Sequence, residues 1–435
     1  MRARWVVLVA GMAVAVAACT PGTQGGPAAP RPDARDGATP AVSPVAEPRE
    51  LLVLGSPLGA AVLDARTGSE LFAGVGVPAL GDWSMLATAT ATTTGDATVV
   101  RVTRDVSGES VGTARVAGQL AVRTVSPDGS RVALMAPLPP GANPWIPEDR
   151  ASTTIVVTNP SGYFHTKRFH LKGNFEPEAF SADNTGLFLI KYVPAIDPVA
   201  YRVTRLDLDE GEVYPVFGRL KSPVETMSGT RLMQLPAPNG ARLYTLYTSQ
   251  PAEYAREYDP MQAKAGTPVA FVHTLSLDDG WAECVGLPRA LGDGNPVHEA
   301  LALSPDGRSL YVVDTQRGVV AVMDTRRMKV VRDAKADFSA LGGGQVHAAV
   351  GSDGRTLVVA AGNRVEVLRT RTMRPEHEWT ASGPVTALGF GSEGRNLYVA
   401  MPGAVEELDL STGRSVRILR TPGSQAYLYV GSLTS

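Results

Sequence analysis

The stretch LALSPDGRSLYVVDTQRGVVAVMDTRRMKVV, residues 301–331, decides the fold. It contains short apolar runs separated by polar segments, and the four runs lie at 300–303, 310–313, 319–324 and 328–331. Runs of this length that are rich in β-branched residues predict β-strands. The segment SPDG at 304–307 predicts a hairpin, because proline presets φ, aspartate can bond its own backbone and glycine tolerates positive φ. The stretch therefore predicts four consecutive antiparallel strands, which we name A, B, C and D.

Copies of this turn, each followed by apolar runs, recur along the chain. The clearest copies are SPDG at 126–129, GSDG at 351–354 and GSEG at 391–394, and looser versions lie at 181–184 and 237–240. The turn glycines Gly307, Gly354 and Gly394 are 47 and 40 residues apart. A period of about 40 to 50 residues built from four strands is typical of one blade of a β-propeller. The sequence therefore predicts an all-β propeller of four-stranded antiparallel blades.

The turn SPDG at 304–307 followed by LYVVD at 310–314, with LYVA at 397–400 as a second copy, resembles the YVTN and lactonase-like β-propeller repeats of bacteria. The resemblance covers most of residues 50–420. It implies the propeller fold but no particular activity, because propellers carry unrelated functions on one scaffold.

The number of blades follows from the predicted C strands. They start near eight residues, namely Ala60, Ala97, Thr153, Ala200, Ala270, Val319, Arg364 and Ala404. Seven blades remain an alternative, because the segment at 85–92 lacks a good turn motif. The first blade has B, C and D segments at 51–54, 60–64 and 70–72 but no A segment, and AYLYV at 426–430 is left over. We expect this C-terminal strand to complete the first blade and close the ring, which removes exposed sheet edges.

The N-terminus has the features of an export signal. Residues 1–4 are basic, residues 5–18 form an apolar run too short to span a bilayer, and VAAC at 16–19 ends the run. This pattern resembles a bacterial lipoprotein signal, which implies removal of residues 1–18 and acylation of Cys19. The alternative is an ordinary secretory signal with a chance cysteine.

Residues 20–49 are rich in proline, alanine and glycine and lack aromatic residues. Such a segment cannot bury enough apolar surface to fold. We therefore expect residues 19–49 to be a lipidated cysteine and a flexible tether, which holds a propeller domain of residues 50–435 at the extracytoplasmic face of the cell membrane.

The composition argues against a nucleic-acid partner. The 435 residues are 44% hydrophobic and 19% charged, with a formal net charge of -2. A nucleic-acid-binding domain would normally carry a strong basic excess. The expected partners are the membrane, through the N-terminal lipid, and an envelope protein or glycan.

Three insertions in predicted B–C connections are candidates for partner binding. They lie at 137–150, 193–198 and 249–267, and they contribute the aromatic residues Trp145, Tyr254 and Tyr258. Long loops on a rigid scaffold often carry function, and aromatic side chains give contact area at low entropic cost. The alternative is that these loops only cover the core.

A second candidate site combines histidines and carboxylates. His298, Glu299 and His347 lie at the predicted starts of two neighbouring A strands, and Glu178 lies at the start of a third. If they met at the mouth of the central channel, they could hold a divalent metal that activates water. The alternative is that each side chain bonds a neighbouring blade or a channel water. The sequence predicts no cofactor, and it leaves the presence of a metal open.

The chain contains no convincing catalytic motif. GESVG at 108–112 fits G-x-S-x-G, but that motif needs a strand-to-helix elbow and here it joins predicted strands. Cys284 lies on a predicted D strand, where we expect a buried, unreactive thiol. We therefore expect an envelope binding or scaffold module rather than an enzyme. The alternative is a metal-dependent lactonase or esterase-like hydrolase that uses the central channel.

Overall fold

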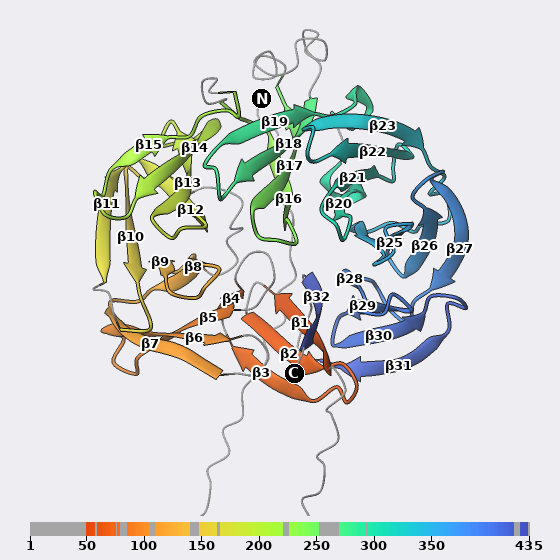
Figure 1. Ribbon diagram of the computed structural model, residues 1–435, viewed down its shortest axis with the longest axis horizontal. Helices are drawn as coiled ribbons and strands as arrows, with labels where there is room; N and C mark the ends of the chain where they lie inside the picture. The colour runs from red at the N-terminus through yellow and green to blue at the C-terminus, as the bar shows by residue number, and fades with distance from the viewer. Residues whose placement is uncertain are drawn as a thin grey trace, which may run out of the picture. The chain divides into compact units, whose positions relative to one another are not determined.

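The computed structural model describes residues 49–433 except 57–58, 75, 79–84, 105–108, 140–147, 163–165, 221–225, 252–268, 293–294 and 422–426. Residues 46–435 form one compact unit. In this unit eight four-stranded antiparallel sheets follow one another around a ring (Figure 1). The fold is an eight-bladed β-propeller, and no α-helix occurs in the part of the chain that the structure describes.

The first four blades take up the chain up to Pro215. Blade 1 consists of β32 (Tyr427–Leu433), β1 (Arg49–Ser56), β2 (Gly59–Asp64) and β3 (Glu70–Gly74). Blade 2 consists of β4 (Gly76–Pro78), β5 (Met85–Ala91), β6 (Ala97–Arg104) and β7 (Glu109–Ala117). Blade 3 consists of β8 (Ala121–Val125), β9 (Val132–Met135), β10 (Ser152–Thr158) and β11 (Lys167–Lys172). Blade 4 consists of β12 (Asn174–Phe180), β13 (Gly186–Val193), β14 (Ala200–Asp207) and β15 (Val213–Pro215).

The other four blades follow in order. Blade 5 consists of β16 (Thr230–Pro236), β17 (Arg242–Gln250), β18 (Val269–Ser276) and β19 (Ala282–Gly286), and the short 3-10 helices η1 (Arg289–Leu291) and η2 (Pro296–His298) come after it. Blade 6 consists of β20 (Glu299–Leu303), β21 (Ser309–Asp314), β22 (Val319–Asp324) and β23 (Lys329–Lys335). Blade 7 consists of β24 (His347–Val350), β25 (Thr356–Ala361), β26 (Arg364–Arg369) and β27 (Arg374–Thr380). Blade 8 consists of β28 (Ala387–Phe390), β29 (Asn396–Met401), β30 (Ala404–Asp409) and β31 (Ser415–Arg420).

The prediction of eight blades is confirmed, and the seven-bladed alternative is wrong. Each C strand begins at the predicted residue or one residue before it. The sequence between β4 and β5 of blade 2 lacks the recurrent turn motif, and the B–C hairpin of this blade has a well-defined turn. There the Thr92 hydroxyl donates to Asp96 Oδ1 at 2.7 Å, and Gly95 has a φ of +70°.

The recurrent SPDG turn forms for the predicted reason. The Ser304 hydroxyl donates to Asp306 Oδ1 at 2.7 Å, and the Arg308 amide donates to the same oxygen at 3.0 Å. Gly307 has a φ of +68°, a conformation that glycine adopts without strain. The same serine-to-aspartate bond occurs in the copies that contain Ser126 and Ser181.

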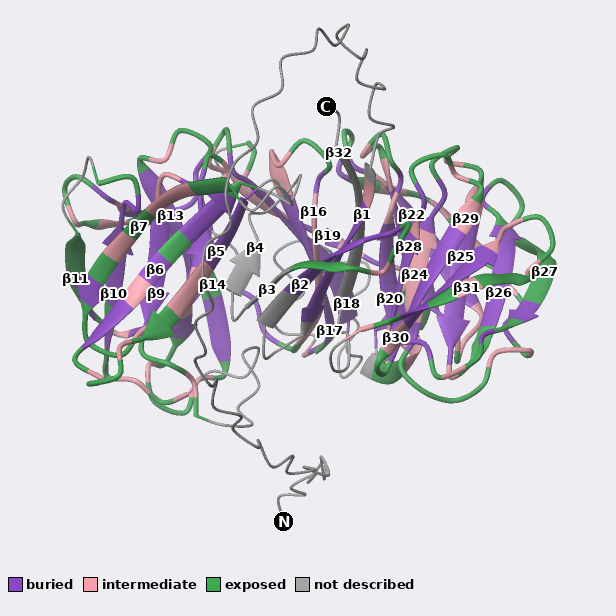
Figure 2. Ribbon diagram, turned by 90° about the horizontal axis from the view of Figure 1, so that it is seen from below, coloured by how far each residue is buried: buried purple, intermediate pink, exposed green. Residues whose placement is uncertain are grey.

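The hydrophobic core is divided among the interfaces between blades. Each cluster of buried apolar side chains combines residues of two neighbouring sheets, as where Phe188 and Tyr201 of blade 4 pack with Tyr247 and Phe271 of blade 5. In Figure 2 the middle strands are largely buried, whereas exposed residues gather on outer strands and connections. Among the described residues, no helix has the length and apolar character needed to cross a membrane.

The two ends of the blades differ. One end carries the A–B and C–D turns, which are short, and we call it the turn face. The other end carries the B–C and D–A connections, which include the predicted insertions, and we call it the insertion face. At the turn face the A–B and C–D turns of a blade are bonded together, as where the Thr325 amide donates to the Arg308 carbonyl at 3.0 Å.

The C-terminal strand lies in blade 1. β32 pairs antiparallel with β1, in a register that runs from Leu433 opposite Arg49 to Tyr427 opposite Gly55. The strand therefore begins one residue later than the segment 426–430 predicted from sequence, and extends three residues further.

Candidate functional site

Four of the predicted site residues lie outside the described part of the chain. Trp145 falls in 140–147, Tyr254 and Tyr258 fall in 252–268, and Cys19 precedes residue 49. Their predicted roles therefore stay predictions.

The structure brings together two of the three predicted A-strand starts. His298 ends η2 directly before β20, and His347 begins β24 in the next blade. The Val346 amide donates to the Val297 carbonyl at 2.8 Å, so the segments that lead into β20 and β24 are adjacent. Burial lowers the pKa of His347 to about 4, which keeps this imidazole neutral near pH 7.

Glu178 does not join them, and this corrects the prediction that it lies at the start of an A strand in a comparable position. It lies in the middle of β12, at an irregularity in the register between Pro177 and Ala179. Its Oε1 accepts a hydrogen bond from Arg231 Nη2 at 2.9 Å and another from the Gln234 amide. A buried carboxylate needs such partners, because an unpaired charge is costly away from water.

The predicted convergence of His298, Glu299, His347 and Glu178 on one metal is therefore absent. In the part of the chain that the structure describes, no group of three or more histidine, cysteine, aspartate or glutamate side chains is arranged to hold a metal ion. The donor set needed for the hydrolase alternative is not assembled among these residues.

The inner strands carry charge on one side of the ring. Glu176 in β12 pairs with Arg123 in β8 at 2.8 Å and with Arg150 at 3.0 Å, and Glu178 pairs with Arg231 in β16. These pairs link the inner strands of blades 3, 4 and 5. The inner strands of blades 6 to 8 instead read EALAL, HAAV and ALGF and are mostly apolar.

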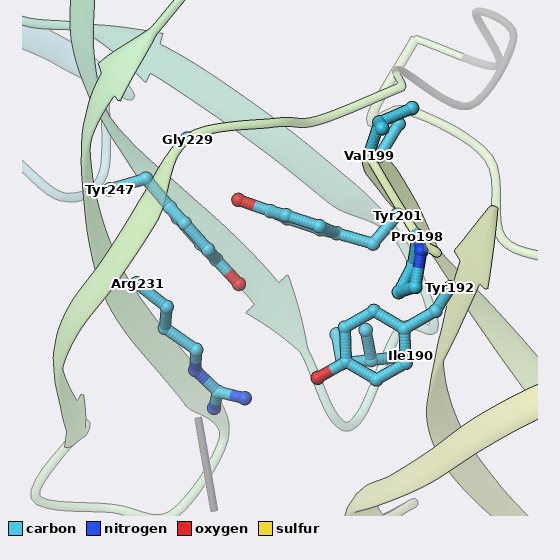
Figure 3. A pocket seen from close by; sticks show the side chains of 9 residues that line it. Ile190, Tyr192, Pro198, Val199, Tyr201, Gly229, Arg231 and Tyr247 are labelled. Carbon is cyan, nitrogen blue, oxygen red and sulfur yellow. The ribbon is translucent and has the colours of Figure 1, made fainter. Parts of the chain in front are cut away.

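A cavity of about 110 Å³ lies between blades 4 and 5, near the insertion face. Its walls come from β13, from β14 with the connection before it, from β16 with the residue before it, and from β17. The lining residues are Ile190, Tyr192, Pro198, Val199, Ala200, Tyr201, Gly229, Arg231 and Tyr247. Figure 3 shows three tyrosine rings and the Arg231 guanidinium around this space, which we call the tyrosine pocket.

The tyrosine rings are fixed by stacking. Tyr201 and Tyr247 stack with ring centroids 5.2 Å apart, and Tyr247 stacks on Phe271 at 4.9 Å. Tyr192 meets Tyr201 edge to face at 6.2 Å. Such arrangements add stability beyond the buried area. The pocket is therefore preformed and aromatic.

The lining of the tyrosine pocket also contains polar groups. The Tyr201 hydroxyl donates to the Ser228 carbonyl at 2.9 Å. Burial raises the pKa of Tyr192 to about 12 and raises the pKa of Tyr247 as well, so both hydroxyls stay protonated. Arg231, held by Glu178, adds a guanidinium to the wall.

Gly229 is required where the chain enters β16. Its φ is +92°, and a Cβ there would lie 2.4 Å from the Thr248 carbonyl oxygen. Only glycine allows this close approach of two backbone segments. It lets the start of β16 lie against β17 beside the tyrosine pocket.

A buried histidine–cysteine pair lies close to the tyrosine pocket. His273 Nδ1 and Cys284 Sγ are 3.6 Å apart, and both side chains are buried. Burial, with a smaller effect of the Arg231 charge, lowers the pKa of His273 to about 3. The adjoining cavity measures only about 10 Å³, which leaves no room for a substrate. Cys284 is therefore the buried thiol that the sequence predicts, and it lies on a D strand as expected.

The His273 environment predicts a pH dependence of stability. The folded pKa lies below the unfolded value of about 6.5, so the unfolded state binds more protons as pH falls through that range. Protonation of His273 in the unfolded state should therefore lower the free energy of unfolding by about 1.4 kcal/mol for each pH unit below pH 6.5. Urea unfolding of the wild type, His273→Gln and the control His170→Gln at pH 7 and pH 5 measures it. An equally steep loss in His273→Gln would refute this origin.

The G-x-S-x-G motif at 108–112 does not have the structure of a catalytic serine site. Ser110 of GESVG lies within β7, the outer strand of blade 2, and the chain continues into β8 without a helix. The strand-to-helix elbow that exposes a nucleophilic serine is therefore missing.

Sequence reasoning missed the tyrosine pocket, although part of the signal was present. The predicted insertion at 193–198 is flanked by Tyr192 and Tyr201. Arg231 and Tyr247 come from the next blade, and only the packing of two blades reveals that they face these tyrosines.

Comparison with known proteins finds similarity in fold but not in sequence. No family model matches the chain, and no curated protein matches it in sequence. Two structures of AztD from Citrobacter koseri are similar to this chain, with TM-scores of 0.53 and 0.51 and 11% sequence identity. The two matches cover 89% and 88% of this chain, and each covers 98% of AztD. Dihydro-heme d1 dehydrogenase NirN in complex with DHE has a TM-score of 0.50 at 14% identity, and the match covers 88% of this chain and 74% of NirN. At such identities the likeness shows a shared propeller fold.

Proposed function

We propose that this protein is an exported, lipid-anchored binding module of the cell envelope, which holds a protein partner on its insertion face. The signal-like residues 1–18 and Cys19 support the anchorage. The tyrosine pocket between blades 4 and 5 is the observation that carries the binding role. The absence of an assembled metal-donor set among the described residues favours binding over the hydrolase alternative.

The size of the tyrosine pocket suits a single side chain. An engineered apolar cavity of roughly 150 Å³ holds benzene, and this pocket measures about 110 Å³. Binding energy at protein interfaces is concentrated in a few side chains that fill such pockets. The proposed occupant is therefore one apolar or aromatic side chain of a partner, with the Tyr192 and Tyr247 hydroxyls available to a polar atom on it.

The rim of the tyrosine pocket favours a protein over a glycan. The connection between β13 and β14 exposes Ile196 (51%) and Val199 (60%) at the surface, and Val199 also lines the pocket. Neighbouring exposed apolar side chains around a pocket mark a protein interaction surface. A sugar presents less apolar surface than a protein to cover these side chains.

We also propose that β32 closes the ring and stabilises it. The position of β32 supports this role, because β32 pairs with β1 and also contacts β28 of blade 8. A closed ring holds the eight blades, and with them the tyrosine pocket, in fixed positions.

The substitution Val199→Glu tests the binding role. A carboxylate at the rim should weaken partner binding at least tenfold, because it would be desolvated in the interface. The probe is a photocrosslinker at Ile196, used on intact cells, with the yield of the partner adduct as the measurement. The matched control is Val416→Glu, since Val416 is similarly exposed (55%) but lies on the outer strand β31. Equal adduct yields in the two variants would contradict the proposal, and adducts made only of glycan would assign the pocket to a sugar.

A further inference from the structure

The turn face carries a concentration of exposed arginines on one side of the ring. In blades 1, 6, 7 and 8 the A–B turns lie at 304–308, 351–355 and 391–395, and the C–D turns lie at 65–69, 325–328, 370–373 and 410–414. The A–B turns expose Arg308, Arg355 and Arg395, and the C–D turns expose Arg66, Arg326, Arg327, Arg371 and Arg414. The same turns expose three carboxylates, those of Asp306, Asp353 and Glu393. We call this surface the arginine half of the turn face.

Most of these arginines are not neutralised by ion pairs. The Nε atoms of Arg308, Arg327 and Arg395 lie 3.8, 3.7 and 3.6 Å from carboxylate oxygens. In all three pairs the arginine side chain is exposed. Exposed pairs at such distances contribute little. The other five arginines form no ion pair within 4.0 Å among the described residues. Their guanidinium groups remain available to an external anion.

The described turns of blades 3, 4 and 5 are mainly acidic. The corresponding turns of blades 3, 4 and 5 expose Asp128, Asp183, Asp209, Glu210, Asp278 and Asp279. Arg131, the basic residue that follows the blade 3 turn, is only half-exposed. The net charge of -2 therefore hides an uneven distribution among the described turns, which are basic in blades 1, 6, 7 and 8 and mainly acidic in blades 3, 4 and 5, where Lys167 at the end of the blade 3 C–D turn pairs with Asp209 at 3.2 Å.

Backbone hydrogen bonds tie the turns of the arginine half together. In each of its repeated blades the C–D turn donates to the carbonyl of the A–B arginine, with Thr325 to Arg308 at 3.0 Å, Thr370 to Arg355 at 2.8 Å and Leu410 to Arg395 at 2.9 Å. The backbone segments that carry the A–B and C–D arginines of a blade are thereby held side by side. A fixed backbone lowers part of the entropy cost of binding.

A hollow of about 680 Å³ adjoins the arginine half, between the turns of blades 5 and 6. Arg308 and Arg326 line it together with Arg242, which donates to the Thr325 carbonyl at 2.7 Å and lies 5.3 Å from the Trp281 ring. Asp278 and Asp306 also line the hollow. Its volume falls within the range of small-molecule sites, so it has room for a phosphorylated headgroup.

The described chain begins at the same face and in the same half. β1 starts at Arg49, and the Ala65 amide of the C–D turn donates to the Glu50 carbonyl at 2.9 Å. The segment that carries Cys19 therefore joins the propeller at blade 1, beside Arg66.

We infer that the arginine half of the turn face docks on the anionic phospholipid headgroups of the membrane that holds the lipid anchor. This inference rests on the proposed anchorage, which keeps the propeller near a bilayer. Guanidinium groups bind phosphate well because they can donate two parallel hydrogen bonds. A basic surface adds electrostatic attraction to anionic lipids to the attachment that the lipid anchor gives. Docking through the turn face would leave the insertion face directed away from the bilayer.

Vesicle binding of residues 19–435 with Cys19→Ser tests the inference, because this chain lacks both the apolar run at 5–18 and an acyl group on Cys19. It should sediment with vesicles that contain phosphatidylglycerol and not with pure phosphatidylcholine vesicles. Raising the salt concentration from 0.15 M to 1 M should abolish binding, since the screening length falls to about 3 Å.

The triple variant Arg326→Gln, Arg355→Gln, Arg371→Gln removes three arginines that lack ion pairs. Each arginine near an anionic surface strengthens binding roughly fivefold, so the variant should bind phosphatidylglycerol vesicles on the order of 100-fold more weakly. The matched control is Arg101→Gln, Arg202→Gln, Arg420→Gln, which removes the same charge from exposed sites away from the turn face and should bind normally.

Two results would overturn the inference. One is equal binding by the two triple variants. The other is binding to soluble polyphosphate but not to vesicles, which would assign the arginines to a soluble polyanion. Neither result bears on whether Cys19 is acylated in cells, so failure here is distinguishable from failure of the proposed anchorage.

Discussion

Replacement of Cys19 by serine should move the protein from the membrane fraction to the soluble exported fraction. The sequence around Cys19 predicts that its thiol carries the anchor, and each buried methylene of an acyl chain contributes about 0.8 kcal/mol. Losing several acyl chains would leave only the weaker attraction of the arginine half. Cell fractionation followed by detergent phase partitioning measures the change, and we expect nearly all of the protein to leave the detergent phase.

The second cysteine provides the control for this experiment. Cys284 is buried in blade 5, so Cys284→Ser should leave partitioning unchanged. Unaltered detergent partitioning of Cys19→Ser would show that residues 1–19 are not a lipoprotein signal.

Deletion of residues 422–435 should cause a large loss of stability. It removes β32 and with it seven registered positions opposite β1. Leu52 and Leu54 of β1, which are buried in the intact protein, would lie on an unpaired edge strand. We expect a loss of several kcal/mol, a large share of the roughly 5 to 15 kcal/mol typical of a folded domain. The exposed edge should also promote aggregation.

Thermal unfolding and light scattering measure these two effects. The control is deletion of residues 434–435, which lie beyond β32 and should leave the melting temperature unchanged. A melting temperature of the longer deletion equal to that of the wild type would show that β32 does not close the ring.

The fold could be predicted from sequence because its determinants are local. The SPDG turn at 304–307 specifies its own hairpin through bonds between Ser304, Asp306 and the following amides. Repetition of that unit then gives the blades and their number. Blade 2 is the hardest to predict because its A–B connection carries no such turn.

The site could not be predicted in the same way, because it depends on contacts between blades. Glu178 has the sequence position of a rim carboxylate, but the structure pairs it with Arg231, which is 53 residues away in the next blade. The tyrosine pocket likewise requires Tyr247 of blade 5 to face Tyr192 and Tyr201 of blade 4. Sequence patterns report which strands form, and they do not report which side chains meet across a blade interface.

The uneven charge of the turn face also could not be predicted from sequence, because it depends on how the blades are arranged. Arg355 and Arg395 follow turn glycines and are unremarkable as single residues, and the total charge of the chain is near zero. The basic half is visible only once the order of the blades around the ring places these turns next to Arg66 of blade 1.

The central claim is that the insertion face binds a protein partner while the turn face lies toward the membrane. The most direct test places a photocrosslinker at Ile196 on the insertion face or at Ser411 on the turn face and irradiates intact cells. We expect a protein adduct from Ile196 that is lost with Val199→Glu, and lipid adducts from Ser411. Equal or stronger capture of the same protein from Ser411, unaffected by Val199→Glu, would contradict it.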